Sequence, residues 1–317
     1  MKIAYFLMFT LLAIARPFAQ TSTSPGTANS SPRNAPLKIG IFADADSLPL
    51  IVADTEGLFA QEGVNVELVR FSSAIERDSA LQAGKIDGAV TDVLAVVLAN
   101  QGGFPLRITS LTNGRYGVAV APGSAITSMQ GLEGKDVAVS LNTIIHYFAD
   151  WSAAHAGMNP SAMRLVPIPK MPVRLEMLLA GQLAAAVMPE PFLTEAKLRG
   201  ARILVASDDS GLEAGVLAFP PLTLARSSAA IAGLYRAYWG AAQRINADAE
   251  RYRSILVSSL SFPDDAARAF VFPKYVKPRL PSQSSIESAE QWLLAKGLIK
   301  TAPAPSAIVD TSVVGGW

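Results

Sequence analysis

The chain has 317 residues, of which 50% are hydrophobic and 17% charged, with 27 lysines and arginines against 26 aspartates and glutamates. This length is enough for two lobes of ordinary domain size, and a chain so close to neutral gives no support for nucleic-acid binding. The sequence contains no cysteine, which excludes disulfides, thiol nucleophiles and thiolate metal sites.

The first 19 residues have the pattern of a secretory signal peptide. A basic start precedes an apolar run over residues 3–15, which is too short to span a bilayer, and small residues around Ala19 allow cleavage. A single N-terminal anchor is the alternative, although Arg16 ends the apolar run early. Residues 20–36 are rich in Ser, Thr, Pro, Gly and Asn, so we expect a flexible linker there. Because no cysteine is available for acylation, the mature protein is expected in the periplasm and not as a lipoprotein.

Short strands alternate with helices over residues 37–112, as in an open parallel sheet. Such alternation favours parallel strands joined by helical crossovers, with ligands bound beyond the carboxyl ends of the strands. We therefore expect residues 37–112 to form a first lobe. Its predicted strands are 37–42, 64–69, 86–90 and 106–111, and its predicted helices are 48–61, 73–83 and 92–100.

The same pattern returns in residues 113–220, the expected second lobe. The turn signal Asn113-Gly-Arg-Tyr116 marks a first crossing between lobes, and a second crossing is expected near residues 207–221. Two similar halves with a passage between them favour a bilobed binder over one long sheet. The predicted strands of this lobe are 136–140, 164–168, 184–188 and 202–205, and its predicted helices are 143–156, 172–180 and 191–199.

Beyond the second crossing the chain becomes helical. Apolar residues recur at spacings of three and four in four segments, which predicts helices within residues 221–300. Residues 301–317 are expected to be a weakly ordered tail. The four helical segments are 228–246, 248–259, 263–270 and 283–296.

Three ordered motifs carry a resemblance to a known family. They are the loop, helix and strand of residues 48–68, the segment Gln82-Ala-Gly-Lys-Ile-Asp-Gly-Ala-Val-Thr-Asp92, and residues 178–192 with the Glu190-Pro191 pair. Over roughly residues 37–298 the chain resembles the periplasmic solute-binding proteins of ABC importers, in the branch that takes nitrate, sulfonates, taurine and thiamine-pyrimidine precursors. The resemblance implies a type II periplasmic binding protein fold. That fold has two doubly wound α/β lobes, a two-crossing hinge, a ligand cleft between the lobes, and C-terminal helices packed on the first lobe.

The resemblance also implies a function. Such a protein binds a small organic solute of the nitrogen heterocycle, amine or sulfonate type, closes its lobes over it, and docks as a monomer on an ABC permease in the inner membrane. It uses no cofactor or metal and is not an enzyme. Bound ligand stabilises the closed form through differential affinity alone.

An enzyme on the same lobes is the competing class. The Gly-x-Ser-x-Gly pattern of many hydrolases is absent, and His146 and His155 stand nine positions apart on one predicted helix, too far to share a metal. Fungal thiamine-pyrimidine synthases share the fold but carry a cysteine-rich segment, and the related menaquinone-pathway dehydratases work in the cytoplasm. A sensory receptor that presents its ligand to a membrane kinase is a third possibility, which the sequence leaves open.

The candidate ligand-binding residues lie where strands end and helices begin, because helix N-terminal N–H groups are unsatisfied donors. Two residues at the first crossing are added, since they either close over a ligand or make hinge contacts. The full set is Asp44, Asp46, Ser47, Thr91, Asp92, Arg115, Tyr116, Ser140, Asn142, Thr143, His146 and Glu190.

In the first lobe the candidates are mainly acidic. Asp44 and Asp46 favour an amine, an aminopyrimidine or a cationic ligand over free sulfonate or nitrate, because ionised carboxylates accept hydrogen bonds but do not donate them. Capping of the helix that begins near Ser47 is the other interpretation for Asp46. Thr91 and Asp92 end a strand and open a helix, so helix capping is their alternative too.

In the second lobe Ser140 or Asn142 is expected to cap the helix that starts at Thr143, which leaves N–H groups for a carboxylate, a phosphate or a ring carbonyl. His146, one turn further on, is either a ligand contact or a packed residue. Glu190 stands between two prolines, which leave few local partners for its carboxylate. Because the resemblance also implies a cleft position for this residue, we expect Glu190 to face the cleft.

Overall fold

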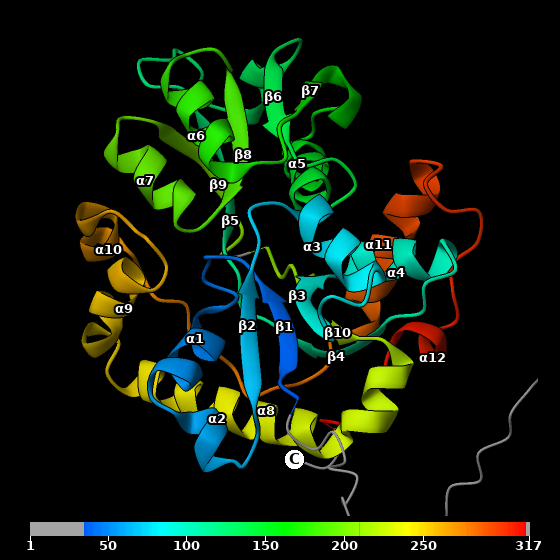
Figure 1. Cartoon of the computed structure of the whole chain (residues 1–317). Coiled ribbons are helices and arrows are strands. Elements are labelled where there is room, and N and C mark those ends of the chain that lie inside the picture. Colours follow the sequence, from blue (N-terminus) through cyan, green and yellow to red (C-terminus); the bar gives the residue numbers. More distant parts are fainter. Residues whose placement is uncertain (1–34, 209, 315–317) are drawn as a thin grey trace, which may run out of the picture. The chain divides into compact units, whose positions relative to one another are not determined.

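The computed structural model describes residues 35–208 and 210–314, which contain two five-stranded sheets (Figure 1). The two sheets have equivalent topologies. The strand order is β2-β1-β3-β10-β4 in the first sheet and β7-β6-β8-β5-β9 in the second. The expected signal peptide, nearly all of the expected linker and the last three residues of the expected tail lie outside the described residues.

The first sheet combines parallel and antiparallel pairing. β1 is parallel to β2 and β3, while β10 is antiparallel to β3 and β4. The antiparallel β10 was not predicted, because its five residues lie within the expected second crossing. It belongs to the first sheet, so the second lobe ends before residue 215 and not at residue 220. The strands are β1 Leu37–Ile41, β2 Val66–Arg70, β3 Gly88–Asp92, β4 Arg107–Leu111 and β10 Gly215–Phe219.

The second sheet repeats this arrangement. β6 is parallel to β7 and β8, and β5 is antiparallel to β8 and β9. In each sheet the strand that follows a crossing is therefore the antiparallel one. The repeat confirms the predicted class of two doubly wound α/β lobes joined by two crossings. The strands are β5 Tyr116–Val120, β6 Asp136–Val139, β7 Arg164–Pro167, β8 Ala185–Pro189 and β9 Arg202–Ala206.

The crossover helices match the predicted ones closely, with one break. The helix expected over residues 48–61 is two helices, because Gly57 between them adopts a left-handed conformation with φ of 67°. Helix α4 is buried at four of its first five positions and packs on β3, β4, β10 and α11, as a core helix does. The helices are α1 Leu48–Thr55, α2 Leu58–Gln61, α3 Ala74–Gln82, α4 Val93–Gln101, α5 Ile144–His155, α6 Met171–Leu179 and α7 Phe192–Leu198.

Most C-terminal helices brace the first lobe, as expected. α8 packs on α1 and α2, and both α11 and α12 pack on α4. α10 differs, because it packs on α7 of the second lobe. The C-terminal region therefore contacts both lobes. Its helices are α8 Pro221–Ala247, α9 Arg253–Ser258, α10 Asp264–Ala269, α11 Gln283–Ala295 and α12 Pro305–Ile308, with a short 3-10 turn over Glu250–Tyr252.

The expectation of a weakly ordered tail is wrong for the part of it that the structure describes. α12 packs on β4 and α4, and Val309 forms a parallel bridge with Ile108 of β4. The N–H of Asp310 donates to the carbonyl of Ile108 at 2.9 Å. The tail is fixed by this edge contact with the first sheet, which its composition alone did not reveal.

Two searches of residues 35–208 and 210–314 were negative. In this part of the chain no helix combines the length and the apolar character needed to cross a bilayer. The same residues contain no group of three or more His, Asp or Glu side chains arranged to hold a metal ion.

Candidate ligand-binding site

A cavity of about 200 Å³ lies between the two sheets, lined by both lobes, and we call it the interlobe cavity. Phe42, Asp92, Ser140 and Pro189 stand at or directly after the carboxyl ends of β1, β3, β6 and β8, and all four line it. This is the position at which open α/β sheets bind ligands. Seven of the twelve predicted residues line the cavity: Asp44, Asp46, Thr91, Asp92, Tyr116, Ser140 and Thr143.

The loop between β1 and α1 brings two buried aspartates to the cavity. Asp44 Oδ1 accepts a hydrogen bond at 3.0 Å from the N–H of Ser47, the residue before α1. Asp46 accepts from the Thr112 hydroxyl and, at 2.8 Å, from the Tyr116 hydroxyl. The helix-start contact expected of Asp46 is therefore made by Asp44, whereas Asp46 binds residues at the first crossing. Ser47 is fully buried and does not line the cavity.

Asp46 is also enclosed by two glycines. A Cβ added at Gly114 would overlap Asp46 Oδ2, and one added at Gly215 would lie 2.8 Å from Asp46 Oδ1. Gly114 belongs to the first crossing and Gly215 begins β10, directly after the second. Both crossings therefore approach the same carboxylate, and only glycine leaves room for it.

Asp92 joins the two lobes. Its Oδ1 accepts from the N–H of Ala95 at 2.8 Å and so caps α4 in the first lobe. Its Oδ2 accepts from the N–H of Ile144, the first residue of α5 in the second lobe, at 3.3 Å. One buried carboxylate thus serves two helix N-termini on opposite sides of the cavity. Capping and a place in the cavity lining, considered as alternatives for Asp92, occur together.

The second lobe contributes hydroxyl groups. Thr143 caps α5 by accepting from the N–H of Ile145, so the cap predicted for Ser140 or Asn142 belongs to Thr143. Ser140 instead accepts from Arg174 at 2.5 Å. Asn142 has an exposed side chain and φ of 61°, and it lies outside the interlobe cavity.

Glu190 does not face the interlobe cavity, so that prediction is wrong. Its Oε1 accepts from Arg115 Nη1 at 2.6 Å and its Oε2 accepts from the N–H of Thr194 at 3.0 Å. Arg115 Nε also donates to Asp208 at 2.6 Å, so Arg115 links the two crossings. The carboxylate of Glu190 is buried, and both of its oxygens have partners. The prediction missed the main partner, Arg115, because it lies 75 residues earlier in the chain. Of the two alternatives for Arg115, the structure shows hinge contacts.

His146 also lies outside the interlobe cavity. Its Nδ1 accepts from the N–H of Asn142 at 3.2 Å, and its ring meets the edge of Trp292 on α11 with centroids 4.8 Å apart. Burial lowers the pKa of His146, which favours the neutral ring. The packed interpretation of His146 is therefore the one that the structure shows.

Two buried arginines were missed by the sequence analysis. Arg77 on α3 donates from Nη1 to the carbonyl of Val90, and Arg174 on α6 donates from Nη1 to the carbonyl of Val187. In both lobes the acceptor stands 13 positions after the arginine. Arg77 lines the interlobe cavity and is only 2% exposed. The feature that could have revealed them is an arginine at the fourth position of both α3 and α6. When each helix is considered alone, such an arginine is interpreted as part of the solvent-exposed face.

The surroundings of the two arginines differ at one position. Ile41 and Val139 accept equivalent parallel-strand hydrogen bonds, so the next residues, Phe42 and Ser140, are counterparts. The Ser140 hydroxyl accepts from Arg174 Nη2, whereas the guanidinium of Arg77 lies 5.0 Å from the centre of the Phe42 ring. Arg77 Nη2 consequently has no hydrogen-bond acceptor in the described residues, although it lies 2.7 Å from Asp78 Oδ1, to which Arg77 Nε donates.

Burial changes the acidity of the cavity carboxyl groups. Burial, reinforced by neighbouring Asp46, raises the pKa of Asp44 to about 7. Burial also raises the pKa of Asp92 to about 6, although the charge of Arg77 acts in the opposite direction. The pKa of Asp46 is raised by burial despite its two hydroxyl donors. The cavity therefore disfavours three negative charges, and a positively charged guest would relieve this penalty.

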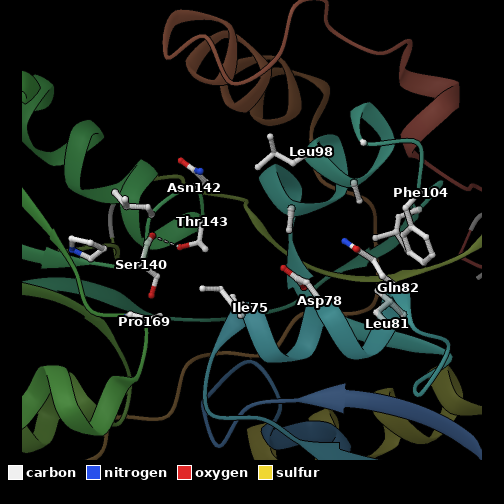
Figure 2. A pocket seen from close by; sticks show the side chains of 17 residues that line it. Ile75, Asp78, Leu81, Gln82, Leu98, Phe104, Ser140, Asn142, Thr143 and Pro169 are labelled. Carbon is white, nitrogen blue, oxygen red and sulfur yellow. Dashed lines mark hydrogen bonds between the residues drawn. The ribbon is translucent and has the colours of Figure 1, made fainter.

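A larger groove adjoins the interlobe cavity. It has a volume of about 560 Å³ and lies between α3 and α4 of the first lobe and the loops after β6 and β7 of the second. Figure 2 shows Ile75, Asp78 and Gln82 of α3 on one side of it and Asn142 on another. The groove and the cavity share Ala74, Ser140 and Thr143, so the two spaces are contiguous.

Two α/β lobes around a cavity that holds buried carboxyl groups define the ligand-binding fold of type II periplasmic binding proteins. The chain belongs to the NMT1/THI5-like family, whose model matches residues 44–237. It is 27% identical over 128 residues to the 4-amino-5-hydroxymethyl-2-methylpyrimidine phosphate synthase of Uromyces fabae. That match covers 36% of this chain and 38% of the relative, so the chain spans well under half of the curated relatives that it matches.

Solved structures support the same fold. The ligand-binding component of an ABC-type import system from Staphylococcus aureus, with zinc bound, has a TM-score of 0.77 and 16% identity and covers 88% of this chain and 97% of its own. The alkanesulfonate-binding protein SsuA from Xanthomonas axonopodis pv. citri, bound to MOPS, has a TM-score of 0.77 and 18% identity, with 88% and 99% covered. At these identities the likeness concerns the fold, which confirms the predicted type II architecture.

Proposed function

We propose that this protein is an extracytoplasmic solute-binding receptor that closes over a small organic solute and delivers it to an ABC transporter permease. The observation that carries the proposal is the interlobe cavity, where Asp92 of the first lobe bonds to Ile144 at the start of α5 in the second. Opening the lobes breaks this contact and exposes the polar groups, so a ligand that bridges both lobes stabilises the closed form. The structural neighbours named as an import-system component and an alkanesulfonate-binding protein support such a role.

The solute is of the nitrogen heterocycle, amine or sulfonate type, and the acidic lining supports an amine-bearing or heterocyclic molecule. The interlobe cavity, at about 200 Å³, fits a molecule little larger than benzene, which a cavity of about 150 Å³ holds. Export by the N-terminal signal peptide and release into the periplasm are parts of the same proposal. They rest on the sequence pattern of residues 1–19.

The alternatives differ in what happens to the solute. The curated relatives are named as synthases, yet neither histidine of this chain lines the interlobe cavity and the sequence has no cysteine. A sensory receptor would bind and close in the same way. Loss of solute uptake on deletion of the protein would support transport over sensing.

The test begins with export of the full chain in a Gram-negative host. We expect a periplasmic protein with a new N-terminus near residue 19, and native mass spectrometry that shows a co-purified solute, released chemically unchanged on denaturation. X-ray scattering should show compaction when the stripped protein meets that solute. A solute returned in altered form would support an enzyme, and absence of both bound solute and compaction would contradict the receptor.

A cavity variant and a matched control sharpen this test. Ala43 lines the interlobe cavity, so Ala43→Leu should reduce its volume and weaken solute binding at least tenfold. Ala180 is exposed at the end of α6, so Ala180→Leu should bind as the wild type does. Equal affinity of both variants would place the solute elsewhere.

A further inference from the structure

Helix N-termini are natural anion sites, and two of them meet at the interlobe cavity. At α5 the N–H of Ile144 is taken by Asp92 Oδ2 and the N–H of Ile145 by the Thr143 hydroxyl. At α4 the N–H of Ala95 is taken by Asp92 Oδ1. The protein's own carboxylate therefore occupies the place that a sulfonate, nitrate or carboxylate ligand would take.

From this arrangement we propose that Asp92 is a built-in anion that makes the closed cavity select a positively charged nitrogen ligand and reject oxyanions. The inference rests on the proposed solute-binding function and specifies its ligand class. Asp92 bonds each helix through a different oxygen, and a carboxylate oxygen has two lone pairs. Both oxygens thus retain acceptor capacity for a ligand N–H.

The other ionisable groups of the lining agree with a cationic guest. Asp44 and Asp46 add two carboxyl groups, and Arg77 is the one cation among the described lining residues. Arg77 already pairs with Asp78, which lies outside the interlobe cavity in the adjoining groove. The guanidinium charge is therefore shared with Asp78, and the three carboxyl groups of the cavity outnumber the single cation among its described lining residues.

Arg77 adds a second preference. Its Nη2 is buried and lies 2.7 Å from Asp78 Oδ1 in an ion pair, but it donates no hydrogen bond to the described residues, while its counterpart in the second lobe donates to Ser140. A buried donor without an acceptor is costly, so this position favours a ligand acceptor atom such as a carbonyl or a ring nitrogen. The ligand class is thus a compact cation, amidinium-like or amine-bearing, and a neutral acceptor on it would add a hydrogen bond from Arg77.

The walls suit a flat molecule. Phe42, Phe71, Tyr116 and Phe192 all line the cavity. Aromatic faces attract cations, and this attraction strengthens where water is excluded. A planar cation therefore gains from the walls as well as from the carboxylates.

Three probes of nearly one shape test the charge: benzamidinium, neutral benzamide and anionic benzoate. Binding to the stripped full-length mature protein is measured by calorimetry at pH 8. We expect benzamidinium to bind at least tenfold more tightly than benzamide and benzoate to show no binding. Benzoate binding as tightly as benzamidinium would overturn the proposal.

Asp92→Asn removes the charge and keeps the side-chain shape. We expect its affinity for benzamidinium to fall at least tenfold. The ratio of its affinities for benzamidinium and benzoate should become smaller or fall below one. Asp136→Asn is the control, because Asp136 pairs with Arg164 at the surface of the second lobe. An Asp92→Asn protein with the wild-type preference would overturn the role of Asp92.

The two proposals fail in different ways. Closure on a co-purified solute without any binding of benzamidinium would refute the cation class and leave the receptor intact. Absence of closure on any solute would refute the receptor. The wild-type probe series does not depend on the variant, so the charge class is tested even where Asp92→Asn folds poorly.

Discussion

Replacing Asp92 with asparagine should stabilise the ligand-free protein at neutral and alkaline pH, although it removes a group of the candidate site. Burial raises the pKa of Asp92 from 3.8 to about 6 in the folded protein. Below pH 3.8 the carboxyl group is protonated in both folded and unfolded chains and has no effect on stability. As pH rises from 3.8 to about 6 the carboxyl group ionises in the unfolded chain but not yet in the folded one, so the folded state loses stability, and above pH 6 the loss is complete.

The size of the effect follows from the shift. A difference of about 2 pKa units corresponds to about 3 kcal/mol of folding free energy at pH 8. Asparagine does not titrate, and it caps helices about as well as aspartate, so the cap on Ala95 is retained. Its amide nitrogen cannot accept from the N–H of Ile144, so that hydrogen bond is lost at every pH. Relative to the wild type, the stability of Asp92→Asn should therefore rise by up to about 3 kcal/mol between pH 4 and pH 8, from a starting point lowered by about 1 kcal/mol for the lost Ile144 hydrogen bond.

Urea unfolding of solute-free protein at pH 4, 6 and 8 measures this difference. Equal dependence on urea concentration in both proteins would show that the same surface is exposed. Asp136→Asn again serves as the control, because an exposed ion pair contributes at most about 1 kcal/mol. An Asp92→Asn protein that is less stable than the wild type by the same amount at all three pH values would refute the reasoning.

Three further substitutions have defined outcomes. Arg115→Met should cost about 2 kcal/mol in urea unfolding, because it leaves the buried Glu190 carboxylate without its cation, and adding Glu190→Gln should restore at least half of the loss; an unchanged midpoint for Arg115→Met would contradict this. Ser140→Ala should cost about 1 to 2 kcal/mol, because it removes an acceptor from buried Arg174, and thermal unfolding no different from wild type would count against it. Asp44→Ala should weaken solute binding at least tenfold by calorimetry, whereas Glu190→Ala should lower stability and leave the affinity of the folded protein unchanged. A loss of solute affinity in folded Glu190→Ala would support the sequence-based placement of Glu190 in the cleft.

The sequence predicted most of the sheet because its strands follow local rules. Apolar residues alternate with other residues along 37–41 and over 64–68, and such alternation reveals a strand without knowledge of its neighbours. β10 was missed because its short apolar run, Gly215–Phe219, lies in the segment that was assigned to the second crossing. Its pairing with β3 and β4 is a tertiary fact.

The site divides in the same way. The positions of Asp44 and Asp92 followed from strand ends, which topology brings together. Glu190 failed because its partner Arg115 is 75 residues away. Arg77 was overlooked because a helical pattern cannot distinguish a buried arginine from a solvated one when the acceptor, Val90, lies on another element.

The contact between α10 and α7 has a mechanical consequence. The second lobe is attached to the first through two crossings, and α10 touches it at a third place. The segments on either side of α10 contain Pro263, Pro273 and Pro278, whose rings restrict backbone rotation. When the second lobe rotates relative to the first, either the contact between α10 and α7 breaks or α10 and its proline-containing flanking segments move with the second lobe. The C-terminal third of the chain therefore restricts the lobe rotation as much as the hinge does.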